Sequence, residues 1–302
     1  MNKFKLWLKA SRAPFFSASV IPVLVGVTLA MREGFFSLLG LCLALVTVVA
    51  THAGSNMIND YYDADGSDPL NRNFSPFNGG SRVIQNRELS KPMVRKWALT
   101  AFGIGLGAVI VGTIWRNNLY IILIGITGTV LGYSYSATNT YGMGRGWGEL
   151  AVGAAFGPLA VLGSYLLQTN HLAWKAFLAG VPVGFLIMGV LILNEFPDIA
   201  PDRAAGKRNW LVRSGGGNRG MWVYLGSICF AYLTILACVL FKVFSPQILL
   251  SLIPLPLLIW IVLRIRRFQK QSTGLVPAMM GNIGLHLITG LLLCLGIWAG
   301  KH

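Results

Sequence analysis

Charged residues are scarce in this sequence. They make up only 12% of its 302 residues, whereas an average soluble domain contains roughly 25%. This scarcity excludes an ordinary soluble globular domain. Cysteine is also scarce, and its spacing suggests neither a metal site nor a disulfide framework. We therefore interpret the four cysteines as inert core residues: Cys42, Cys229, Cys238 and Cys294.

Long apolar runs dominate the chain instead. Hydrophobic residues make up 54% of it, and a membrane-spanning helix needs about 20 mostly apolar residues. Nine segments fit this description, which predicts an all-α integral membrane protein with a single domain over residues 1–302. The predicted spans are 14–31, 37–58, 94–114, 118–137, 148–168, 173–194, 220–241, 247–265 and 278–300.

The basic residues predict the orientation of these spans, because cytoplasmic loops retain Lys and Arg. With the N-terminus inside, 20 of the 25 basic residues lie on the cytoplasmic side. The long polar connections 59–93 and 195–219 then form a cytoplasmic cap on a multi-pass protein of the inner (plasma) membrane. A basic face beside anionic membrane lipid explains the net charge of +15, so no nucleic acid partner is needed.

Seven of the ten acidic residues form two clusters. Each cluster lies where a predicted span, the second or the sixth, reaches the cytoplasmic side. Carboxylates this close together repel one another unless cations neutralise them, and together with Asn oxygens they suit Mg²⁺ or Ca²⁺. The first cluster contains Asp60, Asp63, Asp65 and Asp68, and the second contains Glu195, Asp198 and Asp202.

The two clusters also share a pattern. Asn59-Asp60-Tyr61-Tyr62-Asp63 and Asn194-Glu195-Phe196-Pro197-Asp198 both read Asn, acid, aromatic, any residue, Asp, at an offset of 135 residues. This repetition predicts two four-helix pseudo-repeats, about 14–137 and 148–265, followed by the last helix at 278–300. On a helix, Asn59 and Asp63 share one face, as do Asn194 and Asp198.

Basic residues follow both clusters. Arg72 and Arg82 flank Asn78-Gly79-Gly80-Ser81, and Lys207 and Arg208 follow the second cluster. Divalent ions held by carboxylates bridge phosphate oxygens, and Arg or Lys neutralises the remaining charge, so we predict a diphosphate site. The apolar helices beneath it suit a polyprenyl tail. A cation or metabolite transporter is the alternative, although the middles of the spans are almost free of charge.

These residues carry a family resemblance. Both Asp-rich motifs resemble those of the UbiA-type membrane prenyltransferases. Three segments look most like the 1,4-dihydroxy-2-naphthoate polyprenyltransferase branch (MenA). They are Asn59-Asp60-Tyr61-Tyr62-Asp63 with Gly66-Ser67-Asp68, Phe77-Asn78-Gly79-Gly80-Ser81-Arg82-Val83-Ile84, and Asn194-Glu195-Phe196-Pro197-Asp198 with Asp202-Arg203-Ala204-Ala205-Gly206-Lys207-Arg208.

The resemblance implies Mg²⁺-dependent transfer of a polyprenyl group from its diphosphate to an aromatic quinone precursor. It favours 1,4-dihydroxy-2-naphthoate, and hence menaquinone biosynthesis. It implies metal coordination through Asp63, Asp68, Asp198 and Asp202, assisted by Asn59 and Asn194. Candidate diphosphate contacts are Arg72, Arg82, Lys207 and Arg208. Asp60 or Asp65 is a candidate for deprotonating or orienting the acceptor.

The sequence departs from the family at the acceptor side. Family members commonly place a basic residue within about a turn of the Tyr that ends the fourth helix. After Tyr135 the first basic residue is Arg145, four residues beyond Tyr141. These three residues are our candidates for acceptor binding, and Arg145 either recruits the acceptor's carboxylate or is an ordinary cytoplasmic cation. Other acceptors, such as 4-hydroxybenzoate, a glyceryl phosphate or a tetrapyrrole, are alternatives.

Overall fold

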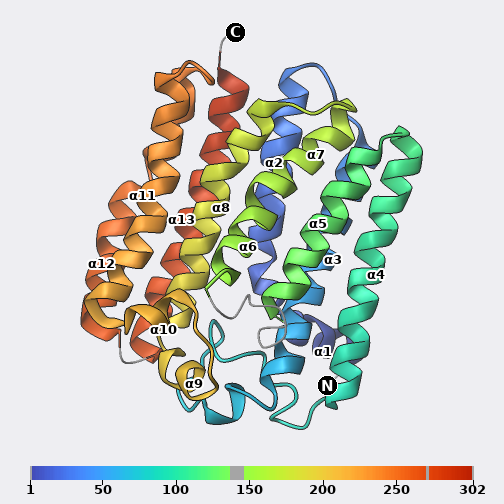
Figure 1. Cartoon of the computed structure of the whole chain (residues 1–302). Helices are drawn as coiled ribbons and strands as arrows, with labels where there is room; N and C mark the ends of the chain where they lie inside the picture. The colour runs from blue at the N-terminus through green and yellow to red at the C-terminus, as the bar shows by residue number, and fades with distance from the viewer. Residues whose placement is uncertain (1, 137–145, 270–271, 301–302) are drawn as a thin grey trace.

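The structure is a computed structural model that describes residues 2–136, 146–269 and 272–300. Within these ranges the chain is helical, and its one β-type pairing is an isolated bridge between Ser75 and Asn78. The long helices stand side by side as a bundle (Figure 1). The prediction of an all-α fold is confirmed for the described part of the chain.

Eight helical segments of the described chain have the length and apolarity of membrane spans. They are η1 with α2 (Ala13–Phe16, Ser17–Arg32), α3 (Leu38–Asp63), α4 (Lys91–Arg116), α6 with η4 and α7 (Gly148–Ala154, Ala155–Leu159, Ala160–Thr169), α8 (Trp174–Glu195), α11 (Gly217–Leu240), η5 with α12 (Pro246–Leu252, Leu255–Phe268) and α13 (Ser272–Ala299). The predicted span 118–137 corresponds to α5 (Leu119–Ser136), which is apolar but shorter over 119–135. Nine crossings therefore stay a prediction.

The ends of the spans follow local rules. Ser37 caps α3, because its hydroxyl accepts a hydrogen bond from the Gly40 amide. Asn117 ends α4 and Asn170 ends α7 in the left-handed conformation, which Asn tolerates better than most residues. The helix α3 runs on to Asp63, five residues beyond the predicted end of the second span. This extension keeps the whole first acidic motif on a helix.

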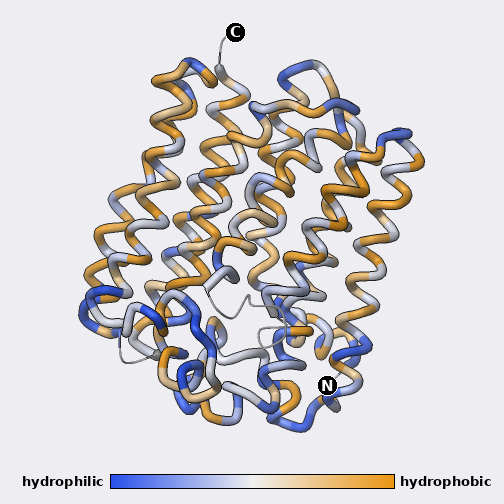
Figure 2. Tube along the Cα trace, viewed as in Figure 1, coloured by the Kyte–Doolittle hydropathy of each residue, from blue (hydrophilic) through white to orange (hydrophobic). Residues whose placement is uncertain are grey.

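One end of the bundle, here called the polar end, carries the short helices and long loops. It contains α1 (Lys3–Ala10), η2 (Asp68–Leu70), α9 (Ile199–Ala204) and α10 (Trp210–Ser214). Figure 1 shows α1, α9 and α10 at the same end of the bundle as the N-terminus, and Figure 2 shows that the hydrophilic residues concentrate at this end. Both long polar connections, 59–93 and 195–219, thus lie at the same end. Its position on the cytoplasmic side stays a prediction.

Glycines allow α8 to pack closely against α6 and η4. A Cβ added at Gly184 would lie 2.3 Å from the Gly153 carbonyl oxygen, and one added at Gly157 would lie 2.5 Å from the Gly184 Cα. Small residues that let helix backbones approach are typical of membrane helix interfaces. The two helices run in opposite directions, so this contact brings the start of α6 beside the end of α8 at the polar end (Figure 1).

The interpretation of all four cysteines as core residues is wrong for two of them. Cys238 is buried and Cys294 half-buried, but Cys42 and Cys229 are exposed on the bundle. Hydropathy cannot separate the two environments, because lipid-facing and core positions of a membrane helix are both apolar.

Candidate active site

A cavity of about 190 Å³ opens among the helices at the polar end. Residues from both acidic motifs line it, although the two motifs are 135 residues apart in the chain. The predicted metal ligands that line it are Asn59, Asp63, Asp68, Asn194, Asp198 and Asp202. The predicted convergence of the two clusters is thus present in the structure.

The first motif is organised by its helical spacing. On α3, the Asn59 side-chain amide donates to the Asp63 Oδ2 at 3.0 Å, across one turn of the helix. The Asn59 carbonyl oxygen accepts from Arg12 Nη2 at 3.0 Å. Both ends of the Asn59 amide are therefore engaged, and in this structure Asn59 orients Asp63.

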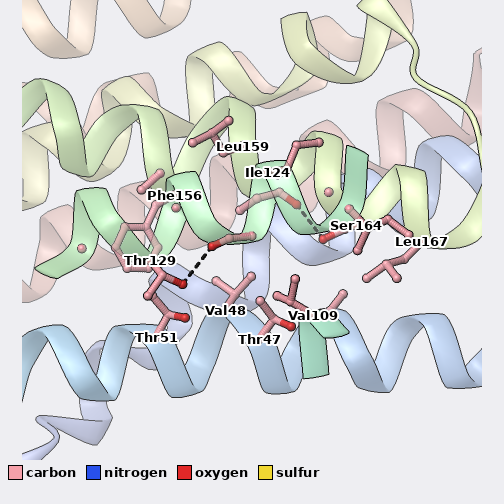
Figure 3. Close-up of a pocket in the computed structure, with 18 of the residues that line it drawn as sticks. Thr47, Val48, Thr51, Val109, Ile124, Thr129, Phe156, Leu159, Ser164 and Leu167 are labelled. Atoms are coloured by element: carbon pink, nitrogen blue, oxygen red, sulfur yellow. Dashed lines mark hydrogen bonds between the residues drawn. The ribbon is translucent and has the colours of Figure 1, made fainter. Parts of the chain in front are cut away.

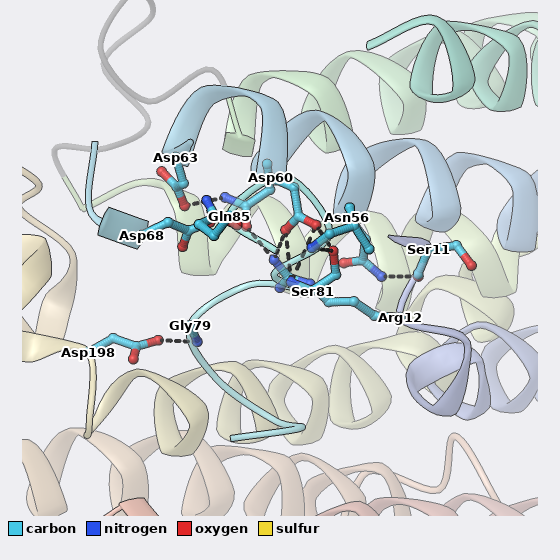
Figure 4. A network of polar contacts seen from close by, with 12 residues as sticks. Ser11, Arg12, Asn56, Asp60, Asp63, Asp68, Gly79, Ser81, Gln85 and Asp198 are labelled. Atoms are coloured by element: carbon cyan, nitrogen blue, oxygen red, sulfur yellow. Dashed lines mark hydrogen bonds and ion pairs between the residues drawn. The ribbon is translucent and has the colours of Figure 1, made fainter. Parts of the chain in front are cut away.

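Arg12 is a further functional candidate, although the sequence predicts only that it is one of the cytoplasmic basic residues. It lines the cavity from the turn between α1 and η1, where its φ of +53° is left-handed. It forms an ion pair with Asp60. The Ser81 amide and hydroxyl also donate to the Asp60 carboxylate (Figure 4). Asp60 itself does not line the cavity, so its geometry fits the positioning of Arg12 better than the predicted contact with an acceptor.

The second motif is held by the loop that follows the first. Asp198 Oδ1 accepts from the side-chain amides of Asn71 at 2.7 Å and Asn78 at 2.6 Å, and Oδ2 accepts from the Gly79 amide at 3.0 Å. Figure 4 shows the Asp198 carboxylate directed at the Gly79 amide. The glycine loop thus brings a backbone amide close to an anion, which is the protein's own carboxylate.

Gly79 is required in this loop for two reasons. Its φ is +73°, a conformation that L side chains rarely adopt. A Cβ at this position would also lie 2.7 Å from both the Asn71 side-chain nitrogen and the Phe74 Cβ. The segment Asn78-Gly79-Gly80 thus allows the loop to pack closely around Asp198.

Lys207 joins the two motifs. Its Nζ lies 2.7 Å from Asp63 Oδ2 and 3.2 Å from Asp202 Oδ1, and its side chain is 14% exposed. Asp202 also accepts a hydrogen bond from Asn209 at 2.9 Å. These two carboxylates raise the pKa of Lys207 in spite of its burial, so the ammonium group stays protonated. Lys207 is one of the predicted diphosphate contacts.

The carboxylates outside the spans are crowded. Burial, with repulsion from Asp63 and Asp60, raises the pKa of Asp68 to about 7. Burial, with repulsion from Asp202, raises the pKa of Asp198 to about 6. Both shifts show that this cavity favours added positive charge. Within the described residues, however, no three acidic, His or Cys side chains form a group that could hold a metal ion by themselves.

Several predicted residues lie elsewhere. Arg72 and Arg208 are exposed, and neither lines the cavity. Arg82 donates to the Asp68 carbonyl oxygen at 2.7 Å and covers the Phe74 ring, so it supports the loop from outside the cavity. Asp65 is exposed and pairs with Lys91 at the surface. Tyr135 lines the cavity, while Tyr141 and Arg145 lie outside the described residues.

An apolar pocket of about 80 Å³ adjoins the cavity. Side chains of α3, including Thr47, Val48 and Thr51, face those of α5 and α7 across it (Figure 3). The pocket and the cavity share four lining residues, which are Ser55, Gly132, Ala155 and Phe156. A ligand with a charged head and an apolar tail could therefore place one part in each space.

A helical bundle of this kind, with a carboxylate-rich cavity above an apolar pocket, is that of a multi-pass membrane enzyme. Over residues 19–297 the sequence matches the UbiA prenyltransferase family, and the chain belongs to that family. It is 30% identical to the 1,4-dihydroxy-2-naphthoate octaprenyltransferase of Escherichia coli (strain K12), covering 100% of this chain and 97% of that protein. It is 28% identical to the 2-carboxy-1,4-naphthoquinone phytyltransferase of Synechocystis sp., covering 98% and 94%.

Solved structures share the fold. A UbiA homolog from Aeropyrum pernix K1 superposes with a TM-score of 0.70 at 14% identity, covering 92% of this chain and 97% of that one. A UbiA homolog from Archaeoglobus fulgidus, bound to GPP and Mg²⁺, superposes with a TM-score of 0.65 at 18% identity, covering 95% and 99%. The protein is therefore a prenyltransferase, and its family membership decides against the transporter alternative.

Proposed function

We propose that the protein transfers a polyprenyl group from a polyprenyl diphosphate to 1,4-dihydroxy-2-naphthoate, a quinone precursor in menaquinone biosynthesis, with Mg²⁺ as cofactor. The observation that carries this proposal is the meeting of both acidic motifs at one cavity whose wall is shared with an apolar pocket. The relatives support the acceptor, because one is named for 1,4-dihydroxy-2-naphthoate and another for a carboxylated naphthoquinone.

The residues at the cavity fit Mg²⁺. This ion prefers oxygen ligands and usually takes one or two carboxylates together with water and substrate phosphates, rather than a complete protein cage. The described residues contain no cluster of three protein ligands, which is consistent with this coordination preference. Asp63 and Asp68 of the first motif and Asp198 and Asp202 of the second would hold metal, with one or two of these carboxylates on each ion. Asn194 Oδ1 is a further oxygen at the cavity, buried and without a hydrogen-bond partner among the described residues.

The chain's own cations would bind the diphosphate. Lys207 and Arg12 both line the cavity, and carboxylates hold each of them in place. When bound, Mg²⁺ supplies positive charge that stabilises the leaving diphosphate. Lys207 and Arg12 add hydrogen-bond donors toward the same oxygens, which favours breaking of the allylic C–O bond. We assign Asp60 to holding Arg12, and we assign no diphosphate contact to Arg72, Arg82 or Arg208.

The apolar pocket would take the tail and keep water from the allylic cation. Phe156 and His52 line the cavity and make an edge-to-face contact, with 4.7 Å between their ring centroids. Phe156 also lines the pocket. The acceptor ring attacks the allylic carbon through its carboxyl-bearing carbon. As the new C–C bond forms there, the bond to the carboxylate breaks, CO₂ leaves, and its electron pair restores the aromatic ring.

The arrangement in the membrane is part of this proposal. The polar end would face the cytoplasm with the N-terminus inside, beside anionic lipid of the inner membrane. This orientation places both substrates' polar groups at an aqueous surface and the tail among the helices. The two pseudo-repeats are supported by α3 and α8, since each ends at the polar end with its acidic motif.

A transfer assay tests the proposal. Purified full-length protein is incubated with Mg²⁺, a polyprenyl diphosphate, and either 1,4-dihydroxy-2-naphthoate, 4-hydroxybenzoate or a glyceryl phosphate. We expect a prenylated product and CO₂ with the naphthoate alone. Asp63→Asn and Asp198→Asn should abolish transfer, whereas Asp65→Asn, which changes an exposed carboxylate outside the cavity, should not. Product with another acceptor alone, or full activity in both cavity variants, would contradict the proposal.

A further inference from the structure

Two glutamates lie on the cavity wall and take no part in the arrangement described above. Glu149, in the first turn of α6, is 1% exposed, and Glu195, the last residue of α8, is 9% exposed. Both line the cavity. The close packing of α6 against α8 at Gly153 and Gly184 brings their helix ends together, and the two carboxylates interact electrostatically.

Each glutamate has a buried oxygen without a hydrogen-bond partner among the described residues. Glu149 Oε1 accepts from the Trp210 amide at 2.5 Å, but Glu149 Oε2 has no donor. Glu195 Oε2 likewise has none. Leaving a buried acceptor oxygen unsatisfied is costly, so such oxygens usually meet a donor when the protein works. Because both residues line the cavity, a bound molecule can bring that donor.

The reactants differ in what they can offer. A polyprenyl diphosphate carries anionic oxygens and a hydrocarbon tail, so it offers the two glutamate oxygens no hydrogen-bond donor. An aromatic acceptor with ring hydroxyls offers O–H donors on a flat apolar body. The wall around the glutamates suits such a body, because Tyr135, Val152 and Leu191 line it.

We propose that Glu149 and Glu195 form the site that accepts hydrogen bonding from the 4-hydroxyl of the acceptor, the ring hydroxyl that is not beside its carboxylate. This inference rests on the proposed function and explains how the enzyme selects and orients the acceptor. The glutamates offer the acceptor's own carboxylate no cation, whereas Arg12 and Lys207 line the same cavity, so the carboxylate points toward them. The carboxyl-bearing carbon thereby faces the diphosphate end of the cavity, where the allylic carbon is.

Steady-state kinetics of the full-length enzyme with Mg²⁺ test this site. Glu149→Gln is a conservative change, because a glutamine oxygen can still accept from the Trp210 amide. Glu149→Gln and Glu195→Gln should each raise KM for 1,4-dihydroxy-2-naphthoate about 2- to 10-fold, the loss expected for one hydrogen bond. KM for the polyprenyl diphosphate should stay unchanged. The matched control is Glu88→Gln, which changes a surface partner of Lys9 and should alter neither constant.

Competitors separate hydroxyl binding from a general structural effect. The inhibition constant of 2-naphthoate, which has no hydroxyl, should be the same in the wild type and both variants. In the wild-type enzyme, 4-hydroxy-2-naphthoate should bind about tenfold more tightly than 2-naphthoate, and this measurement needs no variant to fold.

The inference is overturned if the acceptor KM is unchanged in both glutamine variants, if KM for the diphosphate rises equally, or if the wild type binds both competitors alike. Failure of the proposed function looks different, because the wild-type enzyme would then form no prenylated product from 1,4-dihydroxy-2-naphthoate. That result would remove the proposed function together with this inference.

Discussion

Replacing Lys207 with methionine removes an ammonium group that lies between the two acidic motifs. The change leaves Asp63 and Asp202 without the cation that stands 2.7 Å and 3.2 Å from their oxygens. Breaking a buried ion pair by removing one partner costs about 3–5 kcal/mol. At about 2–4 °C per kcal/mol, the midpoint of thermal unfolding should fall by roughly 6–20 °C.

Tryptophan fluorescence of the solubilised protein, followed during heating without Mg²⁺, measures this midpoint. Lys207→Arg is the matched control, because it retains a cation and should lose much less stability. Mg²⁺ should raise the midpoint of Lys207→Met more than that of the wild type, since it restores positive charge between the motifs. In the transfer assay, Lys207→Met should raise KM for the diphosphate about 10- to 100-fold. An unchanged midpoint and an unchanged KM would refute the role assigned to Lys207.

Three further predictions concern the loop, the pocket and the metal. Gly79→Ala should disrupt the loop around Asp198 and lower the free energy of unfolding by about 1–3 kcal/mol. Gly103 faces open space, so Gly103→Ala should leave the free energy of unfolding unchanged in the same denaturation series. Thr51→Trp should fill the apolar pocket, so that KM rises for a long polyprenyl diphosphate and not for dimethylallyl diphosphate; equal effects on both would contradict the tail assignment. Lowering the pH from 8 to 6 should weaken Mg²⁺ binding in calorimetric titrations. Protons occupy Asp68, with a pKa of about 7, and then Asp198, with a pKa of about 6, as the pH falls, and a pH-independent affinity would contradict their role as ligands.

The convergence of the acidic motifs could be predicted from the sequence because it depends on periodicity and topology. Helical spacing places Asn59 one turn before Asp63, and the structure confirms this contact. An even number of predicted spans separates the two motifs, which places both at one end of the bundle. Such relations need only the positions of helices along the chain.

The cations at the cavity could not be predicted in the same way. Arg12 lies 48 residues before its partner Asp60, and nothing local distinguishes it from the other basic residues near the N-terminus. Arg72 and Arg208 have the right charge and lie in the right loops, yet both are exposed and neither lines the cavity. The direction of a loop side chain depends on tertiary contacts that composition does not record.

The proposed acceptor site, with Glu149 and Glu195, could not be predicted from the sequence for a similar reason. Glu149 stands alone in the sequence at the start of a predicted span, while Glu195 belongs to the second acidic motif. They share one wall because glycines on α6 and α8 let these helices approach closely, and pairwise helix packing cannot be read from hydropathy. The surprising position of an acid at the mouth of an apolar span was the signal that could have identified Glu149.

Calorimetric titration of a polyprenyl diphosphate in the presence of Mg²⁺ tests most directly whether the two motifs act as one diphosphate site. The double-mutant cycle uses the wild type, Asp63→Asn, Asp198→Asn and the protein with both changes. If both motifs serve one site, either single change should remove most of the Mg²⁺-dependent affinity, and the double change should cost little more than one. Independent losses that add up in the double variant would contradict this account.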